Sequence, residues 1–398
     1  MLQFFTKNNF IKKHIVILFF LGFYASISNA QVDFLAIKKW VQATPDSVEY
    51  DLAKLTDYLV NSTQSEQEKV RSIYQWIIQN IRYDKQAYKN GNKRINRSNT
   101  DILKRKEAIC WGYSTLFKAM CERANIPCEV ISGYGKTSFD TAPNLKSPNH
   151  AWNSVKIDSS WYLLDATWDS GLIGNVSIFE QKFGHDYFLT PPKYFIVNHL
   201  PADPDWQLLA CPISVAEYKL SATAITLLAE RKDCETNRNK GTFENLSISD
   251  KRLLSAFKAY EYNPTASNKR ELAHAQLDYE AYLTEIAERL QISQKFDSLL
   301  IIQTEMIQLC ETASSLTKLF DTELENCAYN FFNYAVTLTQ ITVNDEDSDL
   351  DKWKNVLHYL EEAQSQLKNL PQNIFTEEAL ARCVDYIAYT KETIESLE

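Results

Sequence analysis

The sequence lacks a second long apolar run after its first thirty residues. A transmembrane helix needs about 20 consecutive apolar residues, so we expect no membrane span in the rest of the chain. The first thirty residues hold three lysines, then the apolar run 15–23, then small and polar residues up to Ala30. This order is typical of a secretory signal peptide. We therefore predict cleavage after Ala30 and a mature chain that is soluble in the periplasm or outside the cell.

An uncleaved N-terminal anchor is the alternative for the same segment. The small residues Ser28 and Ala30 match what a signal peptidase requires, and this favours cleavage. No cysteine lies near the cut, which argues against lipid attachment there.

Basic residues are too few to balance the acidic ones. The chain has 42 Lys and Arg against 51 Asp and Glu, a net charge of -9. Removal of residues 1–30 takes away three lysines and no acidic residue, which leaves 39 against 51 and a charge of -12. Because nucleic acids bind through basic surfaces, we expect no nucleic-acid partner.

Motifs that mark metal and redox sites are missing as well. The chain has no CxxC pair and no HExxH pattern, and His185 and His199 have no partner at metal-ligand spacing. No calcium-binding pattern is present either. We therefore expect no metal and no other cofactor.

Eight cysteines remain after removal of the signal peptide, and an exported protein can pair them. Their connectivity cannot be read from their spacing. If one is catalytic, seven remain, so at least one more is unpaired within the monomer. We expect several others to be inert packing residues, namely Cys121, Cys128, Cys211, Cys310, Cys327 and Cys383.

The first half of the mature chain mixes helix and strand patterns. Apolar residues recur at helical spacing from Gln31 to about Tyr83, and Thr63 with Glu66 indicates a capping box. A polar loop follows over 84–106. The pattern then predicts a helix at 109–125 and strands at 129–134, 151–157 and 161–167. A helix followed by hairpin-linked strands indicates an α+β domain.

The second half is helical. The segment 191–212 is expected to be ordered but irregular, and the polar residues near 233–245 indicate a linker. Helices are predicted at 253–262, 268–290, 296–338, 353–370 and 377–397. No fixed repeat period accompanies them, which favours a helical bundle over a tetratricopeptide-type array. The predicted organisation is a signal peptide (1–30), an α+β domain (31–232), a linker (233–245) and an all-α domain (246–398).

One region combines a nucleophile, a base and an orienting acid. Cys110 falls at the start of the predicted helix, where the helix dipole favours a thiolate. A thiolate needs an imidazole as counter-ion and proton donor, and the imidazole needs a third group that fixes its tautomer. His150 opens the second predicted strand and Asp165 lies on the third, so these three residues are the candidate set.

The strand register permits a contact between His150 and Asp165 without requiring it. A two-residue turn at Asp158 and Ser159 places Trp152 opposite Asp165, with His150 as the diagonal neighbour at about 7 Å between backbones. A three-residue turn would place the two side chains on opposite faces. Asp169 is the alternative orienting acid.

Three sequence blocks resemble the signature of the transglutaminase-like superfamily. They are KEAICWGYS at Lys106–Ser114, NHAWN at Asn149–Asn153 and WYLLDATWD at Trp161–Asp169, in the family's order of Cys, His and Asp. The likeness covers about residues 46–218. It extends to Trp76–Asp84 and, more weakly, to two blocks of the branch similar to kyphoscoliosis peptidase, His199–Pro201 and Trp206–Leu209.

This resemblance implies a role for each residue of the candidate set. In the family the cysteine is the nucleophile, the histidine is the base and the aspartate orients the histidine, and these roles fall on Cys110, His150 and Asp165. It also implies a papain- or transglutaminase-like core with N-terminal helices and a short antiparallel sheet. A glycine that is common two residues before the cysteine is Ala108 here, which bears on the tight turn before the helix. The backbone N–H of Cys110 is the expected oxyanion donor.

The resemblance implies an exported cysteine enzyme that acts on peptide or amide bonds through a thioester. We favour hydrolysis over transfer to an amine, because the similar branch is peptidase-like. One alternative is a true transglutaminase. The other is a non-catalytic module that binds peptides or proteins, and in either case the C-terminal helices can hold a protein partner. Specificity is expected in the loops 84–100 and 138–148, which do not name the substrate.

Overall fold

The computed structural model describes residues 34–89, 98–136, 143–170, 187–234, 243–345 and 349–398. The predicted signal peptide, His185, much of the predicted linker and parts of both predicted specificity loops lie outside these residues. The chain divides into two compact units, one of residues up to Cys128 with Lys156–Ser160, the other of Glu129–Val155 with Trp161–Glu398. In the described part of the chain, every helix is too short or too polar to cross a bilayer.

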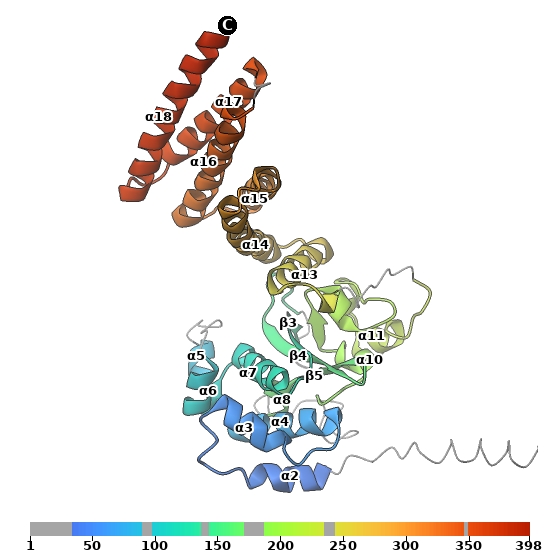
Figure 1. The fold of residues 1–398 in the computed structure, drawn as a ribbon. Helices are drawn as coiled ribbons and strands as arrows, with labels where there is room; N and C mark the ends of the chain where they lie inside the picture. Colours follow the sequence, from blue (N-terminus) through green and yellow to red (C-terminus); the bar gives the residue numbers. More distant parts are fainter. Residues whose placement is uncertain (1–33, 90–97, 137–142, 171–186, 235–242, 346–348) are drawn as a thin grey trace, which may run out of the picture. The chain divides into compact units, whose positions relative to one another are not determined.

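Helices make up most of the first unit (Figure 1). Helix α4 forms its centre, because Val70, Ile73, Trp76 and Ile77 follow helical spacing and are all fully buried. This face packs against α2, α3 and α7. The elements of the unit are α2 (Phe34–Gln42), α3 (Leu52–Val60), α4 (Glu66–Asn80), β1 (Arg82–Tyr83), α5 (Lys85–Lys89), α6 (Asn99–Arg105), β2 (Glu107–Ala108) and α7 (Cys110–Arg123).

The N-cap of α4 is two residues later than the predicted capping box places it. The N-cap is Ser65, whose hydroxyl accepts from Glu68 N at 3.2 Å, while the Glu68 carboxylate accepts from Gln64 N at 2.6 Å. The prediction of Thr63 with Glu66 was wrong because the Thr63 hydroxyl donates to the carbonyl of Val60 at 2.6 Å instead. Both pairs satisfy the same sequence pattern, so only the path of the chain chooses between them.

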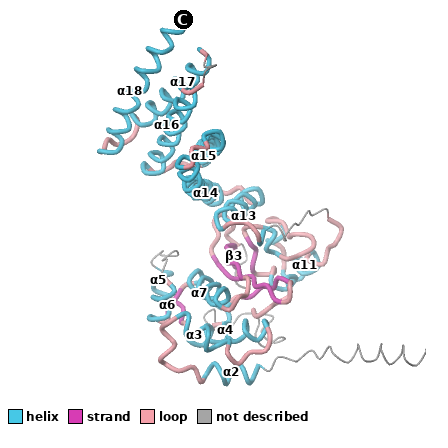
Figure 2. Tube along the Cα trace, in the orientation of Figure 1, coloured by secondary structure: helices cyan, strands magenta, loops and turns pink. Residues whose placement is uncertain are grey.

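A four-stranded sheet with the order β5-β4-β3-β6 carries the other half of the α+β core. Figure 2 draws its strands in magenta around the label β3. Its strands are β3 (Cys128–Gly135), β4 (His150–Ile157), β5 (Ser160–Leu164) and β6 (His199–Pro201). The turn between β4 and β5 has two residues, Asp158 and Ser159, with φ of 47° and 69°. Two successive positive φ angles match the type I′ turn that suits a tight hairpin.

The edge strand β6 was not predicted from the sequence. It lies in the segment predicted to be irregular, and it pairs antiparallel with β3 so that Gly135 faces His199. The predicted third strand also ends earlier than expected, at Leu164, because Asp165 caps the next helix. The short helices of this region are α8 (Ala166–Asp169), α10 (Pro192–Phe195), η1 (Pro204–Gln207), η2 (Glu217–Lys219) and α11 (Ala222–Leu228).

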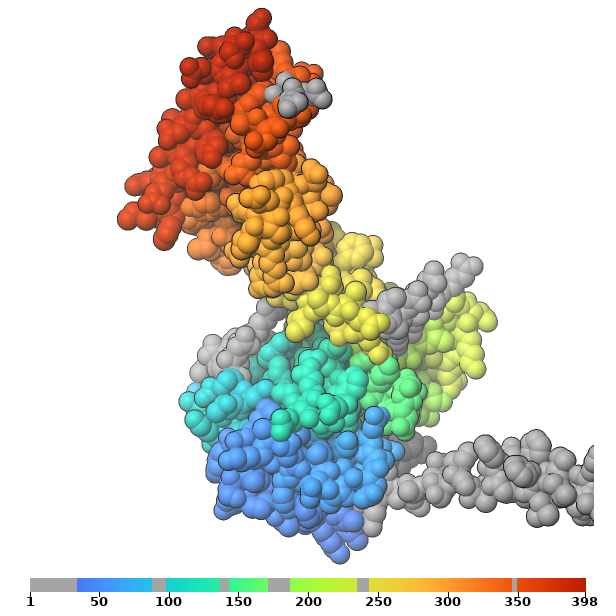
Figure 3. Space-filling model, in the orientation of Figure 1, coloured from blue at the N-terminus to red at the C-terminus, as the bar shows by residue number. Residues whose placement is uncertain are grey.

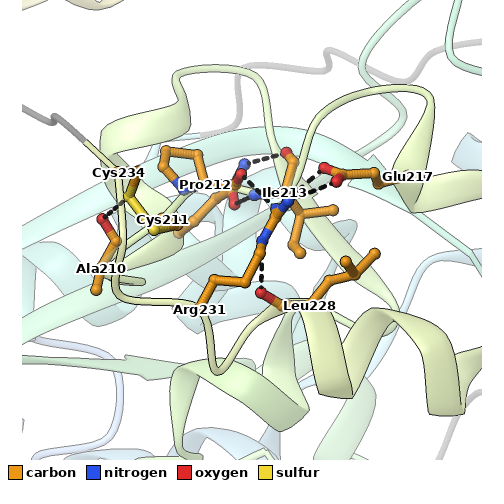
Figure 4. The surroundings of a disulfide bond; sticks show 9 residues. Ala210, Cys211, Pro212, Ile213, Glu217, Leu228, Arg231 and Cys234 are labelled. Carbon is orange, nitrogen blue, oxygen red and sulfur yellow. Dashed lines mark hydrogen bonds and ion pairs between the residues drawn. A yellow bond between two sulfur atoms is a disulfide. The ribbon is translucent and has the colours of Figure 1, made fainter.

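A disulfide between Cys211 and Cys234 closes this region (Figure 4). Beside it, the Arg231 guanidinium donates to both carboxylate oxygens of Glu217 at 2.8 and 3.2 Å and to the carbonyl of Leu228 at 2.9 Å. A forked arginine–carboxylate contact fixes both partners in orientation. Arg231 therefore holds both ends of the segment from η2 to α11, through Glu217 and Leu228.

Long helices follow, and α17 packs against both α16 and α18. Their residues are orange to red in the space-filling view (Figure 3). The predicted helix 296–338 is two helices, because the chain turns back at Thr317, which is extended at φ -154° and ψ 163°. No proline or glycine marks this break, so the helical periodicity of the sequence predicted a single helix. The helices are α13 (Ile248–Tyr262), α14 (Ala266–Ile292), α15 (Phe296–Leu316), α16 (Asp321–Val343), α17 (Leu350–Lys368) and α18 (Ile374–Leu397).

Cysteine pairing corrects part of the packing prediction. Cys310 and Cys327 form a disulfide that joins α15 to α16, and Cys211 also lies in a disulfide, so these three are not free packing residues. Cys121, Cys128 and Cys383 lie outside the two disulfides and are buried, as expected for packing. The remaining cysteine outside the disulfides is Cys110, which is partly exposed.

Helix α13 is fastened to the sheet region. The hydroxyl of Tyr134 on β3 accepts from the side-chain amides of Asn263 and Asn268 at 2.9 and 3.1 Å. Ser255 donates to Asp203 at 2.8 Å, and Lys258 pairs with Asp205 at 2.5 Å. The independence of the predicted all-α domain stays a prediction.

Candidate active site

Strand β2 leads directly into the helix that begins at Cys110. It pairs in parallel with β1, with Tyr83 opposite Ala108. The left-handed residue is Lys106, at φ 54°, whereas Ala108 is extended and buried within the strand. Ala108 therefore needs no glycine conformation here, and the turn that the family glycine suggested lies at Lys106 instead.

The first turn of α7 has no side-chain cap. Its N-cap residue is Ile109, which offers no oxygen to the exposed N–H groups of the helix start. The Tyr113 hydroxyl donates to the carbonyl of Ile81 at 2.5 Å and so ties the helix to the end of α4. A close-packed Gly112 adds to this, because a Cβ there would lie 2.9 Å from the Ala108 Cβ. Cys110 thus stands at an anchored, uncapped helix N-terminus.

Asp165 serves as both a helix cap and a partner for histidine. Its Oδ1 accepts from Thr167 N at 2.8 Å and Trp168 N at 3.2 Å at the start of α8. Its Oδ2 lies 2.6 Å from His150 Nε2. The side chain is fully buried, and these charge-assisted bonds replace the water that the carboxylate loses.

Asp169, the alternative acid, has a different partner. Its carboxylate oxygens accept from the backbone N–H of Tyr187 at 3.3 and 3.4 Å. In the geometry described, Asp165 is the acid bonded to His150.

The position of His150 depends on Asn149 and Gly135. The Asn149 side chain accepts from Gly135 N at 2.7 Å and donates to the Gly135 carbonyl at 3.2 Å, which joins the ends of β3 and β4. A Cβ on Gly135 would lie 3.1 Å from the His150 Cβ and 3.3 Å from Trp168. The missing side chain at position 135 therefore leaves the room in which the His150 ring lies.

His199 also belongs to this cluster, although its sequence pattern did not predict a place there. Its Nε2 lies 3.0 Å from Asp165 Oδ2, the same oxygen that contacts His150. The block His199–Pro201 carried the only sequence signal, a weak resemblance without a role. The contact spans 34 residues, and it forms because β6 pairs with the end of β3.

Aromatic rings enclose both imidazoles. The His150 ring stacks on Trp168 at 5.1 Å between centroids, and the His199 ring stacks on Phe195 at 4.1 Å. Trp152 and Tyr187 complete the wall around His199. Such a dry, apolar lining strengthens the hydrogen bonds at Asp165 relative to water.

Burial and charge compete at the two buried ionisable groups. Burial acts to raise the pKa of Asp165, but the charge and hydrogen bonds of the histidines outweigh it, so the pKa lies well below its ordinary value. Burial lowers the pKa of His199 to about 4, although the bond to Asp165 acts to raise it. His199 is therefore neutral at pH 7, and Asp165 is ionised there.

His150, Asp165 and His199 are also the group of described residues that could hold a metal ion. Their ligand atoms all lie within 4.8 Å of one another, and two imidazoles with one carboxylate suit a transition metal. The direct contacts of 2.6 and 3.0 Å already give each Nε2 a partner. The cluster needs no ion to hold its geometry.

The profile of the transglutaminase-like superfamily matches residues 53–166. Kyphoscoliosis peptidase of Mus musculus is 33% identical over 201 residues, which are 50% of this chain and 30% of that protein. Hillarin of Drosophila melanogaster is 26% identical over 181 residues, 42% of this chain and 22% of that protein. The crystal structure of a TGase aligns with 46% of this chain and 44% of its own, at 20% identity and a TM-score of 0.27.

The chain spans less than a third of the length of these curated relatives. The matched range contains Cys110, His150 and Asp165, and it ends before His199. Residues 53–166 of this chain are therefore the core of a transglutaminase-like superfamily domain.

Proposed function

We propose that the protein hydrolyses peptide or amide bonds with Cys110 as nucleophile, His150 as acid and base, and Asp165 as the residue that orients His150. The hydrogen bond of 2.6 Å between His150 Nε2 and a fully buried Asp165 carboxylate carries the proposal. It fixes the imidazole and leaves Nδ1 as the nitrogen for proton transfer to and from substrate and thiol.

Acylation begins when the Cys110 thiolate attacks the carbonyl carbon of the substrate. The C=O π electrons move to oxygen and give a tetrahedral oxyanion. When it collapses, the C–N bond breaks, the nitrogen takes the proton from His150 Nδ1, and the amine leaves. The start of α7 supports this step, because the Ile109 side chain does not cap its N–H groups, and such groups suit a developing oxyanion.

Deacylation needs a second nucleophile at the thioester. With water as acceptor, His150 removes one proton, the carboxylic acid forms and the C–S bond breaks, which regenerates Cys110 and the charged imidazole. With a lysine amine as acceptor, the same steps yield a cross-linked amide. Hydrolysis is the outcome we favour, because the similar proteins include one named a peptidase.

A protein or peptide is the proposed substrate, again from that name. We also propose export after cleavage behind Ala30. The disulfides Cys211–Cys234 and Cys310–Cys327 support an oxidising compartment, since cytosolic thiols are usually kept reduced.

The test is turnover of a peptide library, with and without an added amine, by the protein and four variants. We expect Cys110→Ala and His150→Ala to lose nearly all activity. Asp165→Asn should lose ~10⁴-fold in kcat, because the carboxylate that holds and stabilises the imidazolium is gone. Asp169→Asn is the matched control and should keep most activity, since an amide oxygen still accepts from Tyr187 N.

Full turnover by folded Cys110→Ala would refute the catalytic proposal. Rapid alkylation of Cys110 at mildly acidic pH separates a catalytic site from a peptide-binding module, with the buried thiols of Cys121, Cys128 and Cys383 as internal controls. A product that contains the added amine would identify a transglutaminase instead.

A further inference from the structure

His199 is a buried histidine to which the proposed mechanism gives no role. Its residue is fully buried, and its Nε2 lies 3.0 Å from Asp165 Oδ2, while His150 Nε2 lies 2.6 Å from the same atom. A carboxylate oxygen only accepts hydrogen bonds. Both imidazoles must therefore donate from Nε2.

The other nitrogen of His199 then defines its charge state. A neutral imidazole with its proton on Nε2 must accept at Nδ1. In the structure Asn198 Oδ1 lies 2.8 Å from Nδ1, and Asn198 Nδ2 donates to the Tyr187 hydroxyl at 2.8 Å. A half-turn of this amide exchanges its two ends, and a neutral His199 requires the turned amide, with its NH₂ donating to Nδ1 and its oxygen accepting from Tyr187.

We infer that His199 is a positioning residue of the Cys110, His150 and Asp165 unit, a neutral second donor that fixes Asp165 Oδ2 for His150. The catalytic part of this inference rests on the proposed function, and the hydrogen-bond part does not. The low pKa of His199, about 4, agrees with a neutral ring.

The sheet explains why a residue so distant in sequence reaches Asp165. Gly135 pairs with His199 across β3 and β6, and Asn149 bonds Gly135 on its other side, directly before His150. With no side chain at Gly135, the two imidazole rings approach to 5.4 Å between centroids. Both rings contact the same carboxylate oxygen, Asp165 Oδ2.

Two donors on each carboxylate oxygen leave Asp165 no freedom to rotate. Backbone N–H groups hold Oδ1, and the two imidazoles hold Oδ2. Without His199, Oδ2 loses one of its two imidazole donors, and Asn198 loses a buried hydrogen-bond partner. The His150 ring then adopts orientations that are unsuited to proton transfer, which lowers kcat but changes KM less.

Nitrogen-15 NMR of the full chain labelled at histidine tests the hydrogen bonds without any substrate. We expect His199 to remain neutral with its proton on Nε2 between pH 8 and about 5, and protected downfield ring N–H signals for His150 and His199. Variants His199→Gln and His150→Gln assign the signals. A charged His199 at pH 7, or a proton on Nδ1, overturns the inference.

Kinetics of His199→Leu and His199→Gln test the catalytic part. Leucine removes the donor and should lower kcat about 10- to 100-fold with KM nearly unchanged, because a hydrogen bond to a charged group is lost. Glutamine keeps an N–H donor and should recover at least part of this loss. Phe195→Leu is the control, since it removes the stacked ring but leaves the donor in place.

Equal losses in His199→Leu, His199→Gln and Phe195→Leu would show that His199 only fills space, and would overturn the positioning role. If folded Cys110→Ala turns over substrate like the unchanged protein, the proposed function fails while the NMR result still decides the hydrogen bonds. If no substrate is turned over, the alkylation rate of Cys110 replaces kcat in the same comparison.

Discussion

The buried side chains of His199 and Asp203 give stability two pH dependences of opposite sign. Burial lowers the pKa of His199 from 6.5 to about 4, so the unfolded chain takes up this proton first as the pH falls. The stability contributed by His199 is therefore lost between about pH 6.5 and 4. Burial raises the pKa of Asp203 from 3.8 to about 6, so its contribution is present below pH 3.8 and lost as the pH rises toward 6.

We predict that Asp203→Asn stabilises the protein at pH 8. The asparagine oxygen still accepts from Asp205 N, and its NH₂ can donate to the Ser255 hydroxyl in place of the bond that the carboxylate accepted, but the side chain carries no charge to bury. The pKa difference corresponds to a gain of up to about 3 kcal/mol in the free energy of unfolding at pH 8, and little at pH 4. Urea unfolding at the two pH values measures it. Asp205→Asn is the control, and an equal gain from it, or a gain at pH 4, would contradict the burial argument.

At the scale of elements, the end of β3 governs how closely the two histidines approach. Gly133 and Gly135 lie on the same strand, opposite Pro201 and His199. A Cβ on Gly133 would lie 2.4 Å from the carbonyl oxygen of Leu200, a backbone atom that cannot turn aside. A Cβ on Gly135 would meet the His150 and Trp168 side chains at 3.1 to 3.3 Å, which can shift by a few tenths of an ångström.

We predict different outcomes for alanine at these two positions. Gly133→Ala should separate β3 from β6 and cost more stability than the ~1–3 kcal/mol typical of overpacking. Gly135→Ala should fold, but its displaced His150 should lower kcat about 10- to 100-fold. Thermal unfolding and kinetics separate the two effects. A fully active Gly135→Ala protein would show that the His150 position is less constrained than its contacts indicate.

The starts of the helices show how much structure a local sequence pattern can predict. Cys110 at the first turn of α7 follows from periodicity alone, and the structure places the helix start there. The choice of Ser65 rather than Thr63 as the N-cap of α4 does not follow from the local pattern, because two equivalent patterns overlap. The break between α15 and α16 lacks a proline or glycine, and only the packing of α16 back onto α15 reveals it.

At the scale of the whole molecule, α13 joins the long C-terminal helices to the sheet. Lys258 of α13 forms an ion pair with Asp205, and the amides of Asn263, which ends α13, and Asn268, on α14, donate to the Tyr134 hydroxyl. These bonds do not depend on the segment 235–242, in which the sequence predicts a linker. A cut in that segment therefore leaves them intact.

We predict that limited proteolysis cuts within 233–242 and that the two fragments stay together. Size-exclusion chromatography of the cut protein should give one peak that contains both. Tyr134→Phe removes the acceptor of both amides and should loosen the pair, with Tyr162→Phe as an exposed control. If the cut protein without any substitution gives separate peaks, the C-terminal helices form the independent domain that the sequence suggests.

Much of this protein follows from its sequence alone. The α+β class, the helical C-terminal half, the helix start at Cys110 and the resemblance to the transglutaminase-like superfamily depend on local patterns, which a short stretch of chain carries by itself. The roles of Cys110, His150 and Asp165 remain predictions, although the two-residue turn and the bond between His150 and Asp165 agree with them.

Only the tertiary structure decided the rest. His199 meets Asp165 because an edge strand returns beside β3, and nothing in the residues around position 199 specifies which edge it joins. The partners of Cys211 and Cys310 depend on how α11 and α16 are placed, for the same reason. Contacts between distant segments arise from the joint packing of all the elements, and their spacing in the sequence leaves no periodic mark.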